Sequence, residues 1–342
     1  MGHETPTGFR ESDIRPDTLM KGQQERFDAD MRRLLERRAD FVEVPCPACG
    51  SAVRGKLFEK YGLDYVSCGK CETVYICPRP TPAILEHYYA TSENYWYWNK
   101  YIFPATEDAR RENIFRPRAE RVKEICDRHG KAGGVLLEVG SGFGTFCAEM
   151  QRIGGFSRII AVEPTPDLSN TCRERGIEVI NKPVEQVSFG RDEIDVIVSF
   201  EVIEHLFSPR DFLIKCRDIL SPGGLLVLSC PNVKGFDIMV LQALSVSVDA
   251  EHLNYFHPDS LSLLLGECGF ETMEVSTPGK LDAELVRKKI LSGELDVSGM
   301  PFIKYALVDM WEEAGENFQR FLADNRMSSH MWVVARKKGE EA

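Results

Sequence analysis

Four cysteines stand in two tight pairs near the start of the chain. Two residues separate Cys46 from Cys49 and Cys68 from Cys71, and 18 residues lie between the pairs. Four thiolates at this spacing fill the tetrahedral shell of Zn²⁺ and leave no open position, which is typical of a structural zinc site. Redox-active pairs are the main alternative, and the spacing differs from the usual iron–sulfur runs. We therefore expect a structural zinc ion.

A glycine-rich turn forms the second candidate site. The apolar run 135–139 leads into Gly140, Gly142 and Gly144, and a helical pattern follows. Glycines let a ligand approach the backbone, and a helix N-terminus offers free N–H groups to an anion. A second apolar run ends at Glu163, whose carboxylate can accept both hydroxyls of a ribose. The pattern predicts a site for an adenosine-type ligand.

Two carboxylates and two imidazoles form the third candidate. Glu201, Glu204 and His205 follow the apolar run 195–199, and His252 comes later in the chain. Together they could hold a divalent cation, and imidazole suits Mn, Fe or Zn better than Mg²⁺. Alternatively, His205 or His252 acts alone as a general base. A purely structural role, with Glu204 capping a helix and His252 bonded to backbone, is also open.

The expected secondary structure that must position these groups differs between the first and the later part of the chain. Short apolar runs at 135–139, 159–162, 195–199 and 225–229 alternate with amphipathic segments, which indicates a parallel sheet with crossover helices. Glycine-rich breaks are expected at 140–144 and 223–224, and a closing strand at 331–335. The expected organisation is a helical extension (1–43), a zinc ribbon (44–80), a helical lid (81–132) and a catalytic domain (133–342) with a helical insertion (279–329).

Aromatic residues gather in the expected lid. Tyr95, Trp96, Tyr97 and Tyr101 could exclude water and stack on a substrate ring, or could form a hydrophobic joint between lid and ribbon. In the expected insertion, aromatic side chains at helical spacing favour a core role: Trp311, Phe318 and Phe321. The first helix, by contrast, carries Leu34 and Leu35 among many charges and is expected to be solvated.

Composition limits the class of protein. The 342 residues are 43% hydrophobic and carry a formal net charge of −11, so a packed core is expected and a nucleic-acid partner is disfavoured. No apolar run is long enough to span a bilayer, and the polar start does not resemble a secretory signal. We expect a soluble, cytoplasmic protein with a small-molecule substrate; the oligomeric state is left open.

The order of these motifs resembles the class I S-adenosylmethionine-dependent methyltransferases, and most closely the ubiquinone-biosynthesis type of O-methyltransferase. The likeness rests on the G-x-G-x-G turn, Glu163, the run from Glu201 to His205, and the later segment from His252 to Leu261. A dinucleotide site would instead prefer G-x-G-x-x-G. The resemblance implies an α/β, Rossmann-like fold with a mostly parallel seven-stranded sheet and helices on both faces.

The same resemblance implies roles for individual residues. The three glycines would admit the methionyl part of the cofactor, Glu138 would orient the loop, and Glu163 would hold the ribose. Val184 and Glu185 would lie at the adenine. Further cofactor-binding positions are Ser141, Pro164 and Phe200.

The expected reaction is methyl transfer to a hydroxyl of a small molecule, with a sugar derivative or a specialised or cell-surface metabolite as the first acceptor class. Alternatives are a C- or N-methyltransferase on a sugar nucleotide, an RNA 2′-O-methyltransferase, or a non-catalytic adapter that uses the zinc ribbon. S-adenosylmethionine and structural Zn²⁺ are the expected cofactors. A divalent cation at Glu201, Glu204, His205 and His252 is the open addition.

Overall fold

The computed structural model describes residues 9–190 and 193–339. Residues 1–8 of the expected N-terminal extension lie outside this range, as do residues 191–192 and 340–342. Within the described part of the chain, no helix is both long and apolar enough to cross a membrane.

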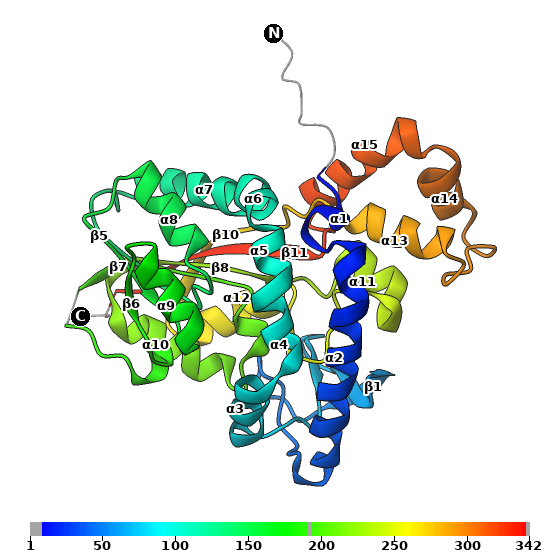
Figure 1. The fold of residues 1–342 in the computed structure, drawn as a ribbon, viewed down its shortest axis with the longest axis horizontal. Helices are drawn as coiled ribbons and strands as arrows, with labels where there is room; N and C mark the ends of the chain where they lie inside the picture. The colour runs from blue at the N-terminus through cyan, green and yellow to red at the C-terminus, as the bar shows by residue number, and fades with distance from the viewer. Residues whose placement is uncertain (1–8, 191–192, 340–342) are drawn as a thin grey trace.

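Seven strands form the central sheet, in the order β10-β11-β8-β7-β4-β5-β6 (Figure 1). Their bounds are Val135–Val139 (β4), Arg158–Val162 (β5), Glu178–Ile180 (β6), Ile194–Phe200 (β7), Leu220–Pro231 (β8), Phe270–Ser276 (β10) and His330–Lys337 (β11). Strands β4 to β8 pair in parallel, and β11 is antiparallel to both β8 and β10. The expectation of a mostly parallel seven-stranded sheet is confirmed.

Helices cover both faces of this sheet because the strands are apolar on both sides. Leu136 packs with side chains of α7 (Arg116–Arg128) and α8 (Thr145–Ile153), whereas its neighbour Leu137 belongs to the core beneath α10 (Pro209–Ile219) and α12 (Pro258–Glu267). Successive side chains of a strand point to opposite faces, so continuous apolar runs are what a strand buried on both sides requires.

The prediction that a glycine-rich break at 223–224 precedes the strand is wrong. Strand β8 begins at Leu220 and includes both glycines. Its register with β7 shifts between Ile194 and Val196. A bulge in the pairing, rather than a loop, accommodates the two glycines.

A second, four-stranded sheet contains the cysteine-rich segment. Strands β1 (Arg54–Lys60), β2 (Leu63–Cys68) and β3 (Val74–Ile76) are antiparallel, and β3 pairs with β9 (Asn254–Tyr255). The last strand comes from a segment far along the chain, so the ribbon sheet is completed by the domain that carries the large sheet.

Helix α2 (Asp17–Glu36) is not the solvated helix expected from its charges. Phe27, Met31 and Leu34 are buried and pack against ribbon strands and α3 (Pro82–Thr91). The buried Asp30 also accepts hydrogen bonds from the Ser92 hydroxyl and from the Asn94 N–H at the start of α4 (Glu93–Tyr97). Because they are spaced three to four residues apart, these side chains lie along one face of the helix, which is buried. A count of charged residues does not reveal this face.

The segment 279–329 is largely helical and forms the projection at the upper right of Figure 1. Its α-helices are α13 (Asp282–Leu291), α14 (Pro301–Lys304) and α15 (Trp311–Asp324). Trp311 and Phe318 pack partly against a small core, as expected. Phe321 does not, since 51% of it is exposed.

Candidate active site

The glycine turn joins β4 to α8, and its three glycines have different surroundings. All have positive φ: 79° at Gly140, 54° at Gly142 and 71° at Gly144. A Cβ at Gly140 would lie 2.5 Å from Val202, and one at Gly144 would lie 2.5 Å from Ile177. A Cβ at Gly142 would meet nothing within 4 Å. The outer glycines are therefore required for packing, and Gly142 is the position where a ligand can approach the backbone.

Glu163 lies at the end of β5 and holds this turn. Its Oε2 accepts a hydrogen bond from the Gly142 N–H at 2.8 Å, and its Oε1 accepts one from the Thr165 N–H at 2.9 Å. Burial raises the pKa of this carboxyl, and the two backbone donors oppose the rise. A carboxylate has about four acceptor positions, so capacity for further donors remains.

The other expected cofactor residues differ in their burial and in their hydrogen-bond partners. Glu138 is buried and accepts a hydrogen bond from the Cys147 thiol at 3.0 Å, and burial raises its pKa to about 8. Ser141 is buried beside Cys172, and the Pro164 carbonyl accepts from an asparagine side chain. Glu138 thus bonds to a side chain of α8.

At the expected adenine edge, Val184 is buried and Glu185 is exposed. Phe200, at the end of β7, stacks on Trp332, and the two ring centroids are 5.3 Å apart. The Arg118 guanidinium lies over the Phe200 ring, 5.0 Å from its centroid.

Glu204, His205 and His252 come together as a compact cluster. One potential ligand atom from each lies within 4.8 Å of the others. Nδ1 of His205 lies 3.1 Å from the Glu251 carbonyl, and Nδ1 of His252 lies 3.3 Å from the Ser247 carbonyl. Because a carbonyl only accepts, we assign the proton to Nδ1 in both rings, which leaves each Nε2 with a free lone pair.

The carboxyl of Glu204 is unusual. It is fully buried, and neither oxygen has a hydrogen-bond partner within the described structure. Burial, and then the charge of Glu201, raise its pKa well above the ordinary value. An unpaired buried carboxyl is costly, so this position favours a ligand that supplies positive charge or donors.

Glu201 lies beside this cluster but has other partners. Its Oε1 accepts hydrogen bonds from Ser229 at 2.5 Å and Arg118 at 3.3 Å, and lies 3.5 Å from Nδ1 of His330. Burial raises its pKa, but His330 and Arg118 outweigh burial, and the net pKa is lowered. Its backbone is left-handed, with φ of 56°, which is uncommon for a residue with a side chain. Arg118 and His330 were not identified from the sequence.

The chain matches known proteins in this region. A family model described as a methyltransferase domain matches residues 110–275. Residues 110–275 therefore match the methyltransferase domain family. A ubiquinone biosynthesis O-methyltransferase of Maricaulis maris is 30% identical over 132 residues, covering 35% of this chain and 52% of that protein. The corresponding protein of Caulobacter vibrioides is 32% identical over 116 residues, covering 31% and 46%. The chain thus spans about half the length of these relatives.

Solved methyltransferases also resemble the chain. Phosphoethanolamine N-methyltransferase 2 of Haemonchus contortus, in complex with S-adenosylmethionine, is 16% identical with a TM-score of 0.43, covering 65% of this chain and 53% of that one. An S-adenosylmethionine-dependent methyltransferase of Mesorhizobium loti is 15% identical with a TM-score of 0.41, covering 60% and 91%.

The four cysteines of the N-terminal segment converge. Their sulfurs lie within 4.8 Å of one another, with 3.5 Å between Cys46 and Cys71 and between Cys49 and Cys68. A tetrahedron with Zn–S bonds of ~2.3 Å has edges of about 3.8 Å, whereas a disulfide bond is ~2.05 Å long. The donor set fits zinc. Gly50 has a positive φ of 69° at the first cysteine turn, and Glu72 has a positive φ of 59° at the second.

The aromatic segment does not act as one surface. Tyr97 is buried, and its ring lies under the Arg26 guanidinium of α2. Trp96 and Tyr101 are 47% and 41% exposed and meet edge to face. These three side chains lie at a joint with α2 or at the surface.

Tyr95 faces another tyrosine, which the sequence did not single out. The centroids of its ring and that of Tyr89 are 5.3 Å apart. The Tyr89 hydroxyl is buried without a hydrogen-bond partner in the described structure. Burial, and then the charge of Glu251, raise the pKa of both phenols. The neighbouring Tyr88 and Asn94 donate hydrogen bonds to Glu251, the residue before His252, at 2.8 and 3.2 Å.

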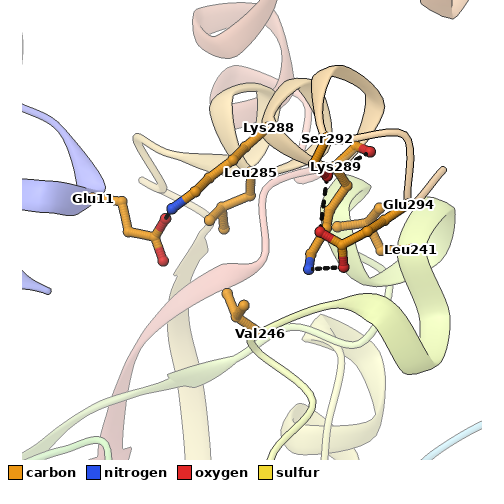
Figure 2. A pocket seen from close by; sticks show the side chains of 8 residues that line it. All are labelled: Glu11, Leu241, Val246, Leu285, Lys288, Lys289, Ser292 and Glu294. Carbon is orange, nitrogen blue, oxygen red and sulfur yellow. Dashed lines mark hydrogen bonds and ion pairs between the residues drawn. The ribbon is translucent and has the colours of Figure 1, made fainter. Parts of the chain in front are cut away.

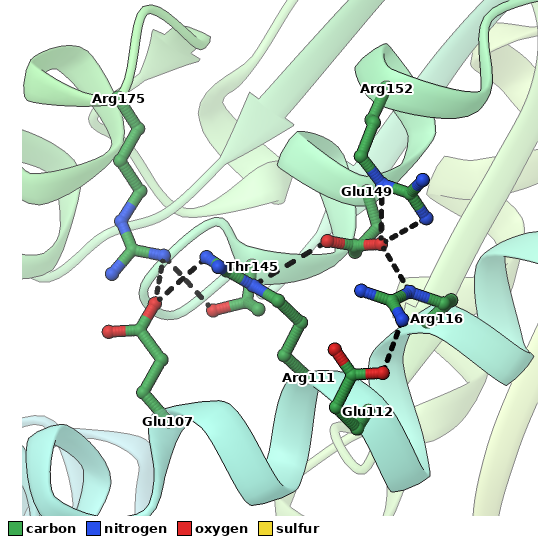
Figure 3. A network of polar contacts seen from close by, with 8 residues as sticks. All are labelled: Glu107, Arg111, Glu112, Arg116, Thr145, Glu149, Arg152 and Arg175. Carbon is green, nitrogen blue, oxygen red and sulfur yellow. Dashed lines mark hydrogen bonds and ion pairs between the residues drawn. The ribbon is translucent and has the colours of Figure 1, made fainter.

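An ion-pair network joins the helical segment 107–116 to α8 and to Arg175 (Figure 3). Arg175 pairs with Glu107 at 2.7 Å and donates to Thr145 at the start of α8. The buried Glu149 accepts from Arg116 and Arg152. The network ties this segment to the helix that follows the glycine turn.

A separate pocket lies between α1 (Glu11–Ile14), α13 and the segment around Val246 (Figure 2). Lys288 pairs with Glu11 across it, and Lys289 pairs with Glu294. None of the expected cofactor or catalytic residues lines this pocket.

Proposed function

We propose that this methyltransferase transfers the methyl group of S-adenosylmethionine to a hydroxyl oxygen of a small molecule, and that Glu204, His205 and His252 hold a divalent cation beside the acceptor. The observation that carries the proposal is the fully buried Glu204 carboxyl, unpartnered in the described structure and next to two imidazoles. The names of the relatives, O-methyltransferases, support an oxygen acceptor.

The cofactor pocket supports S-adenosylmethionine. The open space at Gly142 suits the methionyl part, and Glu163 keeps acceptor capacity for the two ribose hydroxyls. Val184 and Glu185 would lie at the adenine, and Phe200 would bound the pocket near Glu138.

In the reaction, the sulfonium supplies an already activated methyl group, so the chain must mainly position the acceptor and remove a proton. Burial, and then the charge of His252, lower the pKa of His205 well below its ordinary value, so its ring is neutral at pH 7. Nε2 of His205 or His252 can therefore ligate a cation or accept the hydroxyl proton. The oxygen forms the new C–O bond as the C–S bond breaks, and the sulfur leaves with its electron pair.

For the acceptor we place a sugar derivative first and a phenol second, since both carry hydroxyls that a cation can bind. Tyr89 and Tyr95 provide aromatic rings on which such a ring can pack, close enough to Glu251, the residue before His252, for its charge to raise the pKa of both phenols. The net charge of −11 favours a small molecule over RNA. In the ribbon, the four cysteines would hold Zn²⁺ as a structural ion.

The test measures cation binding and turnover together. Wild type is expected to bind one Mn²⁺ by electron paramagnetic resonance and to lose turnover on a panel of sugar derivatives and phenols after chelation. Glu204→Gln should weaken Mn²⁺ binding at least tenfold. Glu201→Gln is the matched control, since the Glu201 carboxylate is held by Ser229 and Arg118, and should bind Mn²⁺ within threefold of wild type. Turnover that is indifferent to chelation would instead support a histidine acting alone as base.

A further inference from the structure

Arg79, at the end of the ribbon, is a buried arginine that has no carboxylate partner among the described residues. It is 1% exposed, and every acceptor of its guanidinium is a neutral oxygen. Nε donates to the Ile76 carbonyl, Nη1 to the Phe207 carbonyl and the Asn254 side chain, and Nη2 to the Leu253 carbonyl, at 3.1–3.2 Å. Burying a charged guanidinium costs free energy, and a neutral side chain could fill the same space without that cost. The directed hydrogen bonds of Arg79 therefore indicate that it fixes the positions of the groups it binds.

Asn254 continues the connection toward the candidate active site. Its Oδ1 accepts from Arg79. Its Nδ2 donates to the Leu206 carbonyl at 2.8 Å and lies within 3.3 Å of the Glu204 carbonyl. The turn 203–207 is therefore held at one end by Asn254 and at Phe207 by Arg79 itself. This turn carries Glu204 and His205.

The same strand is tied to the cysteine cluster. Residues 254–255 form β9, which pairs with β3 of the ribbon. Two residues further on, Nε2 of His257 donates to the Cys71 carbonyl at 2.7 Å. His257 also forms the N-terminal cap of α12. One short segment thus contacts a cysteine turn on one side and the 203–207 turn on the other.

We propose that Arg79 is a positioning residue that acts through Asn254 to hold the 203–207 turn, so that the ribbon sets the placement of Glu204 and His205. The inference rests on the proposed function for its catalytic consequence. Arg79 touches neither cofactor nor acceptor in this scheme. By holding the turn in place, Arg79 reduces the conformational entropy that a free loop would lose each time the cluster is assembled.

The experiment compares the full-length wild type with Arg79→Lys, which keeps the charge but loses the forked donors, and with Asn254→Asp, which keeps Oδ1 and loses Nδ2. Hydrogen–deuterium exchange at residues 203–207 should accelerate at least tenfold in both variants. Mn²⁺ affinity should fall at least tenfold, while S-adenosylmethionine affinity stays within twofold. In the double variant the loss of Mn²⁺ affinity should be smaller than the product of the single losses.

Arg54→Lys is the matched control, because Arg54 belongs to the same cysteine-rich segment, at the start of β1, but pairs with Glu43 at the surface. It should leave exchange and Mn²⁺ affinity unchanged. Exchange at 203–207 that is unaltered in folded Arg79→Lys and Asn254→Asp would overturn the inference. If wild type itself binds no Mn²⁺, the cation in the proposed function is wrong, and the exchange at 203–207 still decides this inference.

Discussion

Replacing Glu163 by glutamine tests the cofactor site most directly. The substitution keeps the size of the side chain but removes its charge and one acceptor oxygen. The native carboxylate already accepts the Gly142 and Thr165 N–H groups, one on each oxygen. In Glu163→Gln, the amide nitrogen must face one of these donors, so the variant also loosens the glycine turn.

The expected loss can be divided between these two effects. Exchanging charge-assisted hydrogen bonds to the ribose for neutral ones should cost ~2–3 kcal/mol of binding free energy, which is about 30- to 150-fold in affinity. One buried N–H left unpaired in Glu163→Gln should lower the free energy of unfolding by ~1–2 kcal/mol without ligand. Denaturant unfolding of the free protein measures the second effect separately.

Calorimetry with S-adenosylhomocysteine and its 2′,3′-dideoxy analogue isolates the ribose contact. Wild type should lose about 30- to 150-fold in affinity when both hydroxyls are removed from the ligand, and Glu163→Gln should lose less than fivefold. Glu178→Gln is the control, since the Glu178 carboxylate on the adjacent strand is exposed and pairs with Arg158. If Glu163→Gln discriminates between the two ligands as strongly as wild type, Glu163 does not bind the ribose.

Three further predictions concern metal, packing and charge. Cys46→Ser should lose the zinc found by metal analysis of wild type and should lower the melting temperature, because one of four converging sulfurs is removed. Gly144→Ala should destabilise the protein by ~2–3 kcal/mol in urea, because its φ is 71° and the new Cβ would meet Ile177. Glu149→Gln should cost about 1 kcal/mol at pH 7, given partly exposed arginine partners. The pKa of Glu149 is lowered because Arg152 and Arg116 outweigh burial, so its contribution is present above the unfolded value of 4.5 and disappears as pH falls through the folded pKa.

Each of these has a matched control. Cys216→Ser, at a buried thiol outside the cluster, should retain zinc. Gly142→Ala shares the positive φ but has open space, so it should cost less stability than Gly144→Ala. Glu112→Gln, in the same network but exposed, should change stability by less than ~0.5 kcal/mol. A pH-independent deficit in Glu149→Gln would contradict the charge argument.

The sequence predicted those parts of the fold whose signals are local. Continuous apolar runs marked the parallel strands, and glycines marked the turn after β4. The cysteine spacing predicted a cluster that the fold does assemble. In each case a few neighbouring residues carry both the pattern and its physical cause, so no knowledge of distant packing was needed.

The features that were missed depend on contacts between distant segments. Arg118 and His330 reach Glu201 from α7 and β11. The sequence around either residue does not indicate that it contacts Glu201. The burial of α2 depends on a ribbon and lid that its own charges do not reveal. For Tyr89 a weak signal existed, since Tyr88-Tyr89 precedes the aromatic segment, but only the fold brings its hydroxyl to a buried, unpaired position.

The ribbon and the methyltransferase domain are better understood as one folding unit than as a module appended to an enzyme. Their shared sheet requires β9, and β9 lies between His252 and His257. Side chains of the ribbon, including Val66 and Tyr75, also belong to the core beneath α10 and α12. Loss of zinc should therefore disturb the order of the 252–257 segment along with the cysteine turns. A chain cut before residue 110 would contain the whole family match and still lack the partner strand and Arg79, so we expect it to fold poorly and to bind Mn²⁺ more weakly than the full chain.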